Sequence, residues 1–183
     1  MIKKIRTPLK DAELKSLKAG DTVLISGKIF TARDAAHKKM DDLLKSGKRL
    51  PVNLKGQVIY YCGPTPAKPG KMIGSAGPTT SSRMDNFTIP LLKLGLKGTI
   101  GKGKRGIVAK EAQRKCGAVY FVATGGAGAL LSQSIKKAKV VAYPELGPEA
   151  IYELEVEDFP AIVGNDLRGK DIFEEGMRKY KKK

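Results

Sequence analysis

The residues best suited to chemistry lie in the stretch GPTTSSRMD, residues 77–85. A Gly-Pro pair precedes four hydroxyl side chains, and Arg83 follows Thr79 by four positions. If Thr79 caps a helix that begins here, its hydroxyl lies beside free backbone N–H groups, where the helix dipole favours an anion. Arg83 would then lie one turn along the same face. The stretch therefore predicts an anion pocket, with a plain cap and a surface charge as the alternative.

Two further cations follow expected strands. Arg33 lies in the first turn of an expected helix directly after a strand, and Lys102 follows the strand-like run 97–100 between two glycines. In open α/β sheets, ligands gather at the carboxyl ends of strands, and glycine lets a ligand approach the backbone closely. Two guanidinium groups and one ammonium group suit a small dicarboxylate. We therefore expect Arg33, Arg83 and Lys102 to bind such a substrate.

Other catalytic motifs are weak or incomplete in this sequence. GKGKRG, residues 101–106, lacks the P-loop spacing, and GGAGA, residues 125–129, lacks the GxGxxG pattern of dinucleotide-binding proteins. His37 is the single histidine, one turn after Arg33, and a lone histidine near a helix start is more often structural or exposed than catalytic. No Ser-His-Asp arrangement is indicated by order or spacing, and the Gly-rich loops contain no pair of carboxylates, so hydrolysis lacks its usual residues.

An alternation of strands and helices must position these residues. Hydrophobic patterns predict strands over 21–30, 57–63, 97–103, 118–124 and 139–145, with further strands within 150–166. Helices are expected over 9–18, 31–47 with Thr31 as N-cap, from about Thr80 with a kink or an interruption at Pro90, over 107–117, and from the Gly-rich turn at 125 to 138. A long Pro- and Gly-rich loop covers 65–78. This order predicts a layered α/β domain with a partly parallel sheet.

Length and composition indicate one domain over residues 1–183. The chain has 41% hydrophobic residues and no apolar run of about 18 residues, so a transmembrane helix, a signal peptide and a second domain are not expected. We place the protein in the cytoplasm. Cys62 and Cys116 are too few to ligate a structural zinc or an iron–sulfur cluster, and we expect both to be reduced and buried.

The formal net charge of +17 raises nucleic acid as a partner. The basic clusters are 37–39, 101–106 and 178–183, and no RNP-like aromatic motif, zinc finger or KH-type GxxG context accompanies them. The basic tail from about residue 176 is expected to be solvated and mobile. A basic nucleic-acid-binding protein without catalysis therefore stays open as an alternative, although nucleic acid is not the expected partner.

Four stretches carry a resemblance to a known family: GKIFTARDAAHKKM, GPTTSSRMD, TIGKGKRG and YPELGPEAIYELEVEDFPAIV. Together they resemble the β subunit of class I fumarate hydratase, which is equivalent to the C-terminal half of the single-chain enzymes of that class. They are also similar to the related β subunit of L-tartrate dehydratase. The resemblance extends over about residues 5 to 175.

The resemblance implies a hydro-lyase of the tricarboxylic acid cycle that interconverts fumarate and water with (S)-malate. In that family the α part holds a [4Fe-4S] cluster through three cysteines. The cluster is therefore expected on a partner α subunit, in an α2β2 heterotetramer, with no metal ligand in this chain. The implied fold is a three-layer, swivelling β/β/α domain.

By motif, the family's substrate-binding arginines fall on Arg33 and Arg83, its lysine on Lys102, and its proposed catalytic threonine on Thr79. Thr79 would act as the base in malate dehydration. A free alcohol is a very weak base at neutral pH, so this role requires the helix N-terminus, nearby cations and a dry, closed site to lower its pKa.

Two segments depart from the single-chain pattern of the family. GKGKRG stands where a form like AKGNRS is expected, and ATGGAGA where SIGGPAA is expected. Neither change removes a substrate-binding residue. They leave both fumarate and tartrate open as the substrate.

Overall fold

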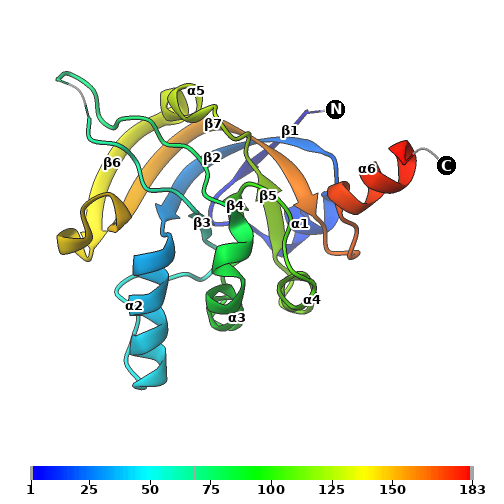
Figure 1. Ribbon diagram of the computed structural model, residues 1–183, viewed down its shortest axis with the longest axis horizontal. Helices are drawn as coiled ribbons and strands as arrows, with labels where there is room; N and C mark the ends of the chain where they lie inside the picture. The colour runs from blue at the N-terminus through cyan, green and yellow to red at the C-terminus, as the bar shows by residue number, and fades with distance from the viewer. Residues whose placement is uncertain (1, 68, 182–183) are drawn as a thin grey trace.

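A mixed β-sheet forms the centre of the molecule in the computed structural model, which describes residues 2–67 and 69–181 (Figure 1). Within these residues the sheet has seven strands: β1 (Ile2–Arg6), β2 (Thr22–Thr31), β3 (Val58–Tyr60), β4 (Gly98–Gly101), β5 (Val119–Val122), β6 (Ile135–Ala142) and β7 (Ile151–Asn165). Their order is β1-β2-β3-β4-β5-β7-β6, and β7 also pairs with β2. The second pairing of β7 closes β2, β3, β4, β5 and β7 into a barrel.

The directions of the strands separate the sheet into two parts. Strands β1 to β5 pair in parallel, whereas the long strand β7 runs antiparallel to β2, β5 and β6. Parallel neighbours need crossover connections, and helices supply most of them here. The carboxyl ends of β2, β3, β4 and β5 consequently meet at one edge of the barrel.

Helices cover the sheet on several sides (Figure 1). The α-helices are α1 (Asp11–Ser16), α2 (Asp34–Lys45), α3 (Asp85–Lys93), α4 (Ile107–Lys115), α5 (Gly128–Leu131) and α6 (Ile172–Tyr180), and the short 3-10 helices are η1 (Ser81–Met84), η2 (Ser132–Ser134) and η3 (Pro144–Glu149). Helices α2, α3 and α4 lie together on one side, while α5 lies at the opposite side. Within the described residues, none of these helices is long and apolar enough to cross a membrane.

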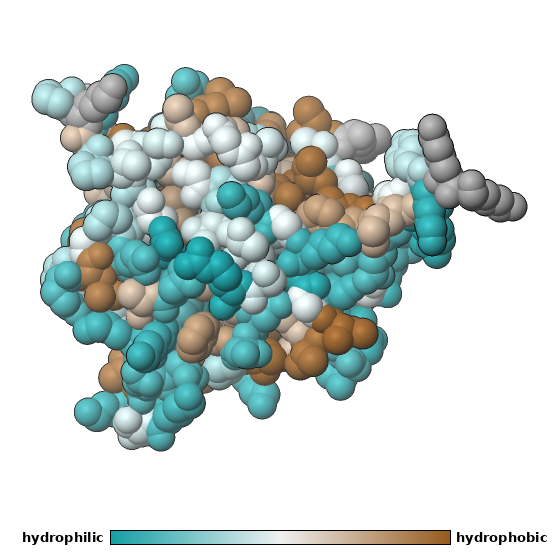
Figure 2. All heavy atoms as spheres, viewed as in Figure 1, coloured by the Kyte–Doolittle hydropathy of each residue, from teal (hydrophilic) through white to brown (hydrophobic). Residues whose placement is uncertain are grey.

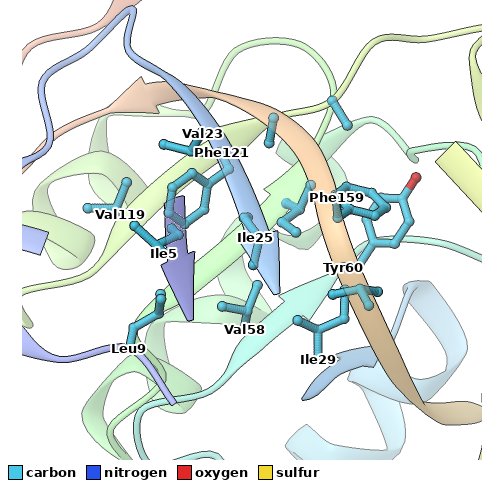
Figure 3. Packing of buried hydrophobic residues seen from close by; sticks show 14 of the residues in the cluster. Ile5, Leu9, Val23, Ile25, Ile29, Val58, Tyr60, Val119, Phe121 and Phe159 are labelled. Carbon is cyan, nitrogen blue, oxygen red and sulfur yellow. The ribbon is translucent and has the colours of Figure 1, made fainter. Parts of the chain in front are cut away.

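Two apolar clusters hold these layers together. Successive residues of a strand point to opposite faces, so Val58 and Tyr60 of β3 face the barrel interior while Ile59 faces the helices. The interior cluster gathers side chains from all seven described strands, including Val23, Ile25, Phe121 and Phe159 (Figure 3). The second cluster packs the outer face of the sheet against α2 and α3, through residues such as Phe30, Ala36, Met40, Leu91 and Leu92. Both clusters fix the strand ends that carry the candidate site.

The predicted α/β class with a partly parallel sheet is confirmed. Strands β3, β4 and β5 and helices α1, α2 and α4 lie within the ranges predicted for them, and β2 extends one residue past its predicted end. The prediction at Pro90 was a kink or an interruption; helix α3 continues through Pro90, so the interruption is wrong. The proline removes one hydrogen bond to Asn86, which is exposed, where water can satisfy the freed carbonyl.

Several other boundaries differ from the prediction. Thr31 is the buried last residue of β2 and not a helix cap, because α2 begins at Asp34. Strand β6 begins at Ile135, where a helix was predicted, because pairing with β7 outweighs local helix propensity. Strand β1 and helix α6 were not predicted. The differences between the predicted and the observed elements therefore lie mainly at the two ends of the chain and at β6.

Candidate active site

The candidate site lies where the carboxyl ends of the parallel strands meet. Arg33 follows the end of β2 by two residues, and Lys102 comes directly after β4. The segment 78–81 passes between the end of β3 and the end of β4. On the face in Figure 2, hydrophilic side chains gather where the strands meet the starts of α2 and α3.

Backbone hydrogen bonds hold the segment 78–81 in place. The N–H of Tyr61 still donates to the carbonyl of Ile100 at 2.8 Å, but beyond this point the two strands separate. Thr79 fills the gap, with its N–H donating to the Tyr61 carbonyl at 2.6 Å and its carbonyl accepting from the Lys102 N–H at 3.1 Å. The Ser81 N–H then donates to the Lys102 carbonyl at 2.9 Å. Thr79 and Lys102 are therefore neighbours through the backbone.

Thr79 is not a helix cap. It lies in extended backbone between two isolated bridges, Cys62 with Pro78 and Thr80 with Lys102, and helix η1 begins at Ser81. The predicted role of Thr79 as the cap is therefore wrong, because Thr80 occupies the N-cap position of η1. The physical reason is that Thr79 uses its own N–H and carbonyl as strand-like partners of Tyr61 and Lys102.

Gly101 permits this close approach. A Cβ at this position would overlap the Ser81 hydroxyl and come within 3.1 Å of the Thr79 carbonyl oxygen. Only glycine leaves room for the segment to lie against the end of β4. The glycine therefore serves the protein's own backbone here as well as any ligand.

Arg33 and Arg83 are brought together by one carboxylate. Arg83 donates from Nε to Oδ1 of Asp34 at 3.0 Å and from Nη2 to Oδ2 at 2.7 Å. The Nε of Arg33 lies 3.4 Å from the same Oδ2. The Arg83 side chain is 50% exposed and the Arg33 side chain 28%, so both guanidinium groups remain accessible from outside the domain.

Glu149 holds Arg33 from the other side. Its Oε1 lies 3.3 Å from Arg33 Nε, and its Oε2 accepts a hydrogen bond of 2.9 Å from the N–H of Ala35 in the first turn of α2. Gly63 makes room for the arginine stem, because a Cβ there would lie 2.9 Å from Arg33 Cδ. Glu149 thus places a negative charge at the start of α2, where the helix dipole favours it, and also holds Arg33 in position.

Lys102 reaches toward the turn after β5. Its Cδ lies 3.4 Å from the point where a Cβ of Gly125 would stand, and the residue as a whole is exposed. Lys102 therefore lies between the segment 78–81 and the Gly-rich turn, on the same edge as the two arginines. This edge of the barrel therefore carries three cations and the half-buried Thr79, a set of residues that is suited to binding an anionic substrate.

A buried arginine supports this edge and was not predicted. The Arg105 side chain is fully buried, and its Nε lies 2.6 Å from Oδ1 of Asp85. Its guanidinium also donates to the hydroxyls of Tyr61 at 2.8 Å, Thr88 at 3.2 Å and Thr99 at 3.4 Å. The rings of Tyr61 and Tyr120 lie 5.3 and 5.4 Å from the guanidinium carbon. Burial works to lower the pKa of Arg105, but Tyr61 and Asp85 outweigh it, so the group stays charged.

The Arg105 network fixes the loop that carries Lys102. Asp85 accepts a hydrogen bond of 2.6 Å from the N–H of Gly106, and the Tyr120 hydroxyl donates to the carbonyl of Gly103 at 2.7 Å. The same Tyr120 hydroxyl lies 2.8 Å from Ser81 Oγ. These contacts bind the loop 101–106 to the segment that carries Thr79 and Arg83.

His37 is buried beneath the arginines. Its Nδ1 lies 2.9 Å from the carbonyl oxygen of Arg33, and its ring packs edge-on against Tyr61. Burial lowers the pKa of His37 to about 4, with a further contribution from the charge of Arg105. At neutral pH the ring is therefore uncharged, and its contacts favour the predicted structural role over catalysis.

The cysteines do not form a metal site. Both are free thiols, with Cys62 buried and Cys116 half-buried, so burial is confirmed fully only for Cys62. Burial raises the pKa of Cys62 to about 12, so it is a thiol and not a thiolate ligand. Among residues 2–67 and 69–181, no three His, Cys, Asp or Glu side chains gather as a metal-binding group. The described side chains consequently do not fit an iron–sulfur cluster.

Comparisons with known proteins cover almost the whole chain. Residues 2–176 match a family model described as Fumarase C-terminus. "Fumarate hydratase class I, anaerobic" of Escherichia coli K12 is 40% identical over 180 residues, which cover 96% of this chain and 33% of the relative. "Fumarate hydratase class I, aerobic" of the same organism is 38% identical over 175 residues, 93% of this chain and 32% of the relative. The chain spans about a third of the length of these relatives, and not the half expected from the resemblance.

Another relative has a similar length to this chain. "Putative L(+)-tartrate dehydratase subunit beta" of Methanocaldococcus jannaschii is 41% identical over 181 residues, which cover 96% of this chain and 93% of the relative. The relatives' names therefore include two different substrates at nearly the same identity.

Proposed function

The chain belongs to the fumarase C-terminus family, as its motifs predicted, and from this we propose that it is the β subunit of a hydro-lyase that reversibly hydrates fumarate to (S)-malate. The observation that carries the proposal is that Arg33 and Arg83 both contact Asp34 at one edge of the barrel, the edge where the Lys102 loop also lies. Two accessible guanidinium groups near an ammonium group suit a substrate with two carboxylates. The names of the fumarate hydratase relatives support this substrate.

In this proposal Arg33 and Arg83 bind the substrate carboxylates, and Lys102 adds a third positive charge. Binding through fixed cations orients the substrate, which lowers the entropy cost of reaching the transition state. The same cations stabilise negative charge that develops near the carboxylates during proton removal. These roles use side chains that are accessible from outside the domain.

Thr79 is the proposed base that removes the proton from malate in the dehydration direction. Its half-buried position and backbone contact with Lys102 support this role, although Thr79 is not the N-cap residue of η1. The lowering of its pKa must therefore come from the nearby cations and from exclusion of water when the site closes. We expect Thr79→Ala to lose most of the activity and Thr79→Ser to retain part of it.

The proposed complex contains an α subunit that carries a [4Fe-4S] cluster, with α2β2 stoichiometry. The name "subunit beta" of the archaeal relative supports such a partner. When bound, such a cluster supplies a Lewis acid for the hydroxyl that leaves malate. The residues of this chain bind and orient the dicarboxylate against it.

Fold and location complete the proposal. We assign the domain to the three-layer, swivelling β/β/α type implied by the family, in an enzyme of the tricarboxylic acid cycle. Two free thiols are in keeping with a reducing compartment such as the cytoplasm.

Tartrate dehydration is the second candidate function. The archaeal relative that supports it has 41% identity and matches over 93% of its own length. Tartrate carries the same two carboxylates as malate and one additional hydroxyl, so the two arginines would serve both substrates. The difference must lie in the groups that face the middle of the substrate.

Anaerobic co-expression with the candidate α subunit tests the proposal. We expect malate dehydration, followed by fumarate absorbance, only when both chains are present. D- and L-tartrate serve as competing substrates, and a preference for L-tartrate would favour the second candidate. A complex that forms but acts on none of these substrates would refute the hydro-lyase proposal. An isolated chain that binds nucleic acid with strong salt dependence would favour the alternative from the other class.

A further inference from the structure

Asp34 occupies an unusual place between the two arginines of the candidate site. It is the first residue of α2. Both of its carboxylate oxygens accept hydrogen bonds from Arg83, and one of them also accepts a hydrogen bond from Arg33. The Asp34 side chain is 34% exposed, so it lies at the mouth of the site and not beneath it. The proposed reaction has no step that uses this carboxylate.

The geometry determines which edges of the arginines remain free. Arg83 donates hydrogen bonds to Asp34 from Nε and Nη2, so Nη1 and the second hydrogen of Nη2 remain available to a ligand. Arg33 directs its Nε to both Asp34 and Glu149, which leaves its two Nη groups. Both guanidinium groups are thereby turned so that their Nη ends are available to a ligand.

The carboxylate also balances charge within the cluster. Arg33 and Arg83 carry like charges and face the same oxygen of Asp34, so without it they would repel each other. A carboxylate that fixes both groups before substrate arrives reduces the entropy lost on binding. Removing it would leave two long, mobile side chains where the structure has two oriented ones.

We propose that Asp34 is a positioning residue of the active site, which holds Arg33 and Arg83 with their Nη ends toward the dicarboxylate. The inference rests on the proposed function, because it assumes that these arginines bind substrate. Asp34 itself does not contact the reacting atoms. It acts through the two arginines.

The test is the kinetics of Asp34→Asn in the complex reconstituted with the α subunit. We expect kcat/KM to fall roughly 10- to 100-fold, the range associated with a misplaced substrate. Most of the loss should be in kcat. KM should change little, because the more positive site attracts the dicarboxylate more strongly and this offsets the weaker binding by less ordered arginines. Asp34→Glu, which restores the carboxylate, should recover part of kcat.

Asp42→Asn provides the matched control. Asp42 lies on the same helix, is exposed, and its replacement changes the net charge by the same amount. It lies eight residues from Asp34, about 12 Å along the helix. We expect this variant to keep the kcat/KM of the parent complex.

A double-mutant cycle separates positioning from a structural role. Arg83→Lys cannot form the two-pronged bond, so Asp34→Asn should cost much less in that background than alone. Losses that multiply independently, or an Asp34→Asn complex with parental kcat/KM, would overturn the Asp34 proposal alone. A parent complex without hydro-lyase activity would overturn the proposed function and this inference together. Thermal unfolding of each variant identifies any loss that reflects folding.

Discussion

Two arginine clusters lie next to each other at the edge of the barrel and differ in what surrounds them. Arg105 has a fully buried side chain, one carboxylate partner and three hydroxyl partners. Arg33 and Arg83 share a carboxylate at the surface and are 28% and 50% exposed. The same side-chain chemistry therefore occurs in a closed network and in an open one.

The difference in burial indicates that the two clusters have different roles in the site. A buried charge must have its partners within the protein, since an unpaired one is very unfavourable, and Arg105 has no donor directed to the surface. The open cluster has Nη groups that a ligand can use. We therefore assign stability of the site to the first cluster and binding to the second.

The largest expected effect is the destabilisation caused by Arg105→Ala. Loss of the guanidinium leaves Asp85 largely buried and unpaired, so the free energy of unfolding should fall by about 3–5 kcal/mol. Arg83→Ala removes a half-exposed ion pair and should change it by about 1 kcal/mol or less. Urea unfolding of the two variants measures the contrast. Equal destabilisation by both substitutions would remove the distinction between the clusters.

His37 lies between the two clusters and should make stability depend on pH. Its folded pKa is about 4, against 6.5 for an ordinary histidine, so the unfolded state binds more protons between these values. Stability should be fully present above about pH 6.5 and should fall progressively toward pH 4. The free energy of unfolding should depend less on pH across this window for His37→Asn, in which the side-chain amide can still donate to the Arg33 carbonyl.

Acidic groups also contribute to the pH profile, and the comparison with His37→Asn separates them. Hydrogen bonds to lysines lower the pKa of Asp11, Asp21, Glu145 and Glu155, so the stability that they add is lost at acid pH. Those groups are the same in both proteins. An identical pH slope for the parent and His37→Asn would mean that His37 is not the buried, neutral group described here.

A smaller effect than that of Arg105→Ala is expected for Tyr120→Phe. The substitution keeps the ring beside Arg105 but removes the hydroxyl between Ser81 and Gly103. Leaving those groups without this partner should cost about 1–2 kcal/mol of unfolding free energy. Activity of the reconstituted complex should also fall, because the Lys102 loop is less firmly held. Unchanged stability and activity would show that the hydroxyl does not couple the two segments.

The sequence predicted the open cluster better than the closed one. Arg33 and Lys102 follow strands, and parallel strands end at one edge, so their common location could be inferred from strand order alone. Thr79 was misassigned because a hydroxyl before a helix resembles a cap, whereas its backbone is used by Tyr61 and Lys102. That pairing depends on the tertiary arrangement of β3 and β4.

Arg105 was missed because it lies in the basic stretch GKGKRG, which taken alone indicates an exposed loop. Its partner Asp85 ends the other motif, twenty residues earlier, and nothing local connects the two. Strand β6 shows the same limit, since its residues Ile135 to Ala138 become a strand through pairing with β7. Contacts between distant segments decided each of these outcomes.

The structure of the reconstituted complex with a bound dicarboxylate would show whether the surface arginines bind substrate while Arg105 only supports them. We expect the substrate carboxylates within about 3 Å of the Nη groups of Arg33 and Arg83, with Arg105 still paired to Asp85. Asp34 should remain bound to the Nε and Nη2 edge of Arg83. A ligand bound away from both surface arginines, or one that contacts Arg105, would contradict the division between an open binding cluster and a closed supporting one.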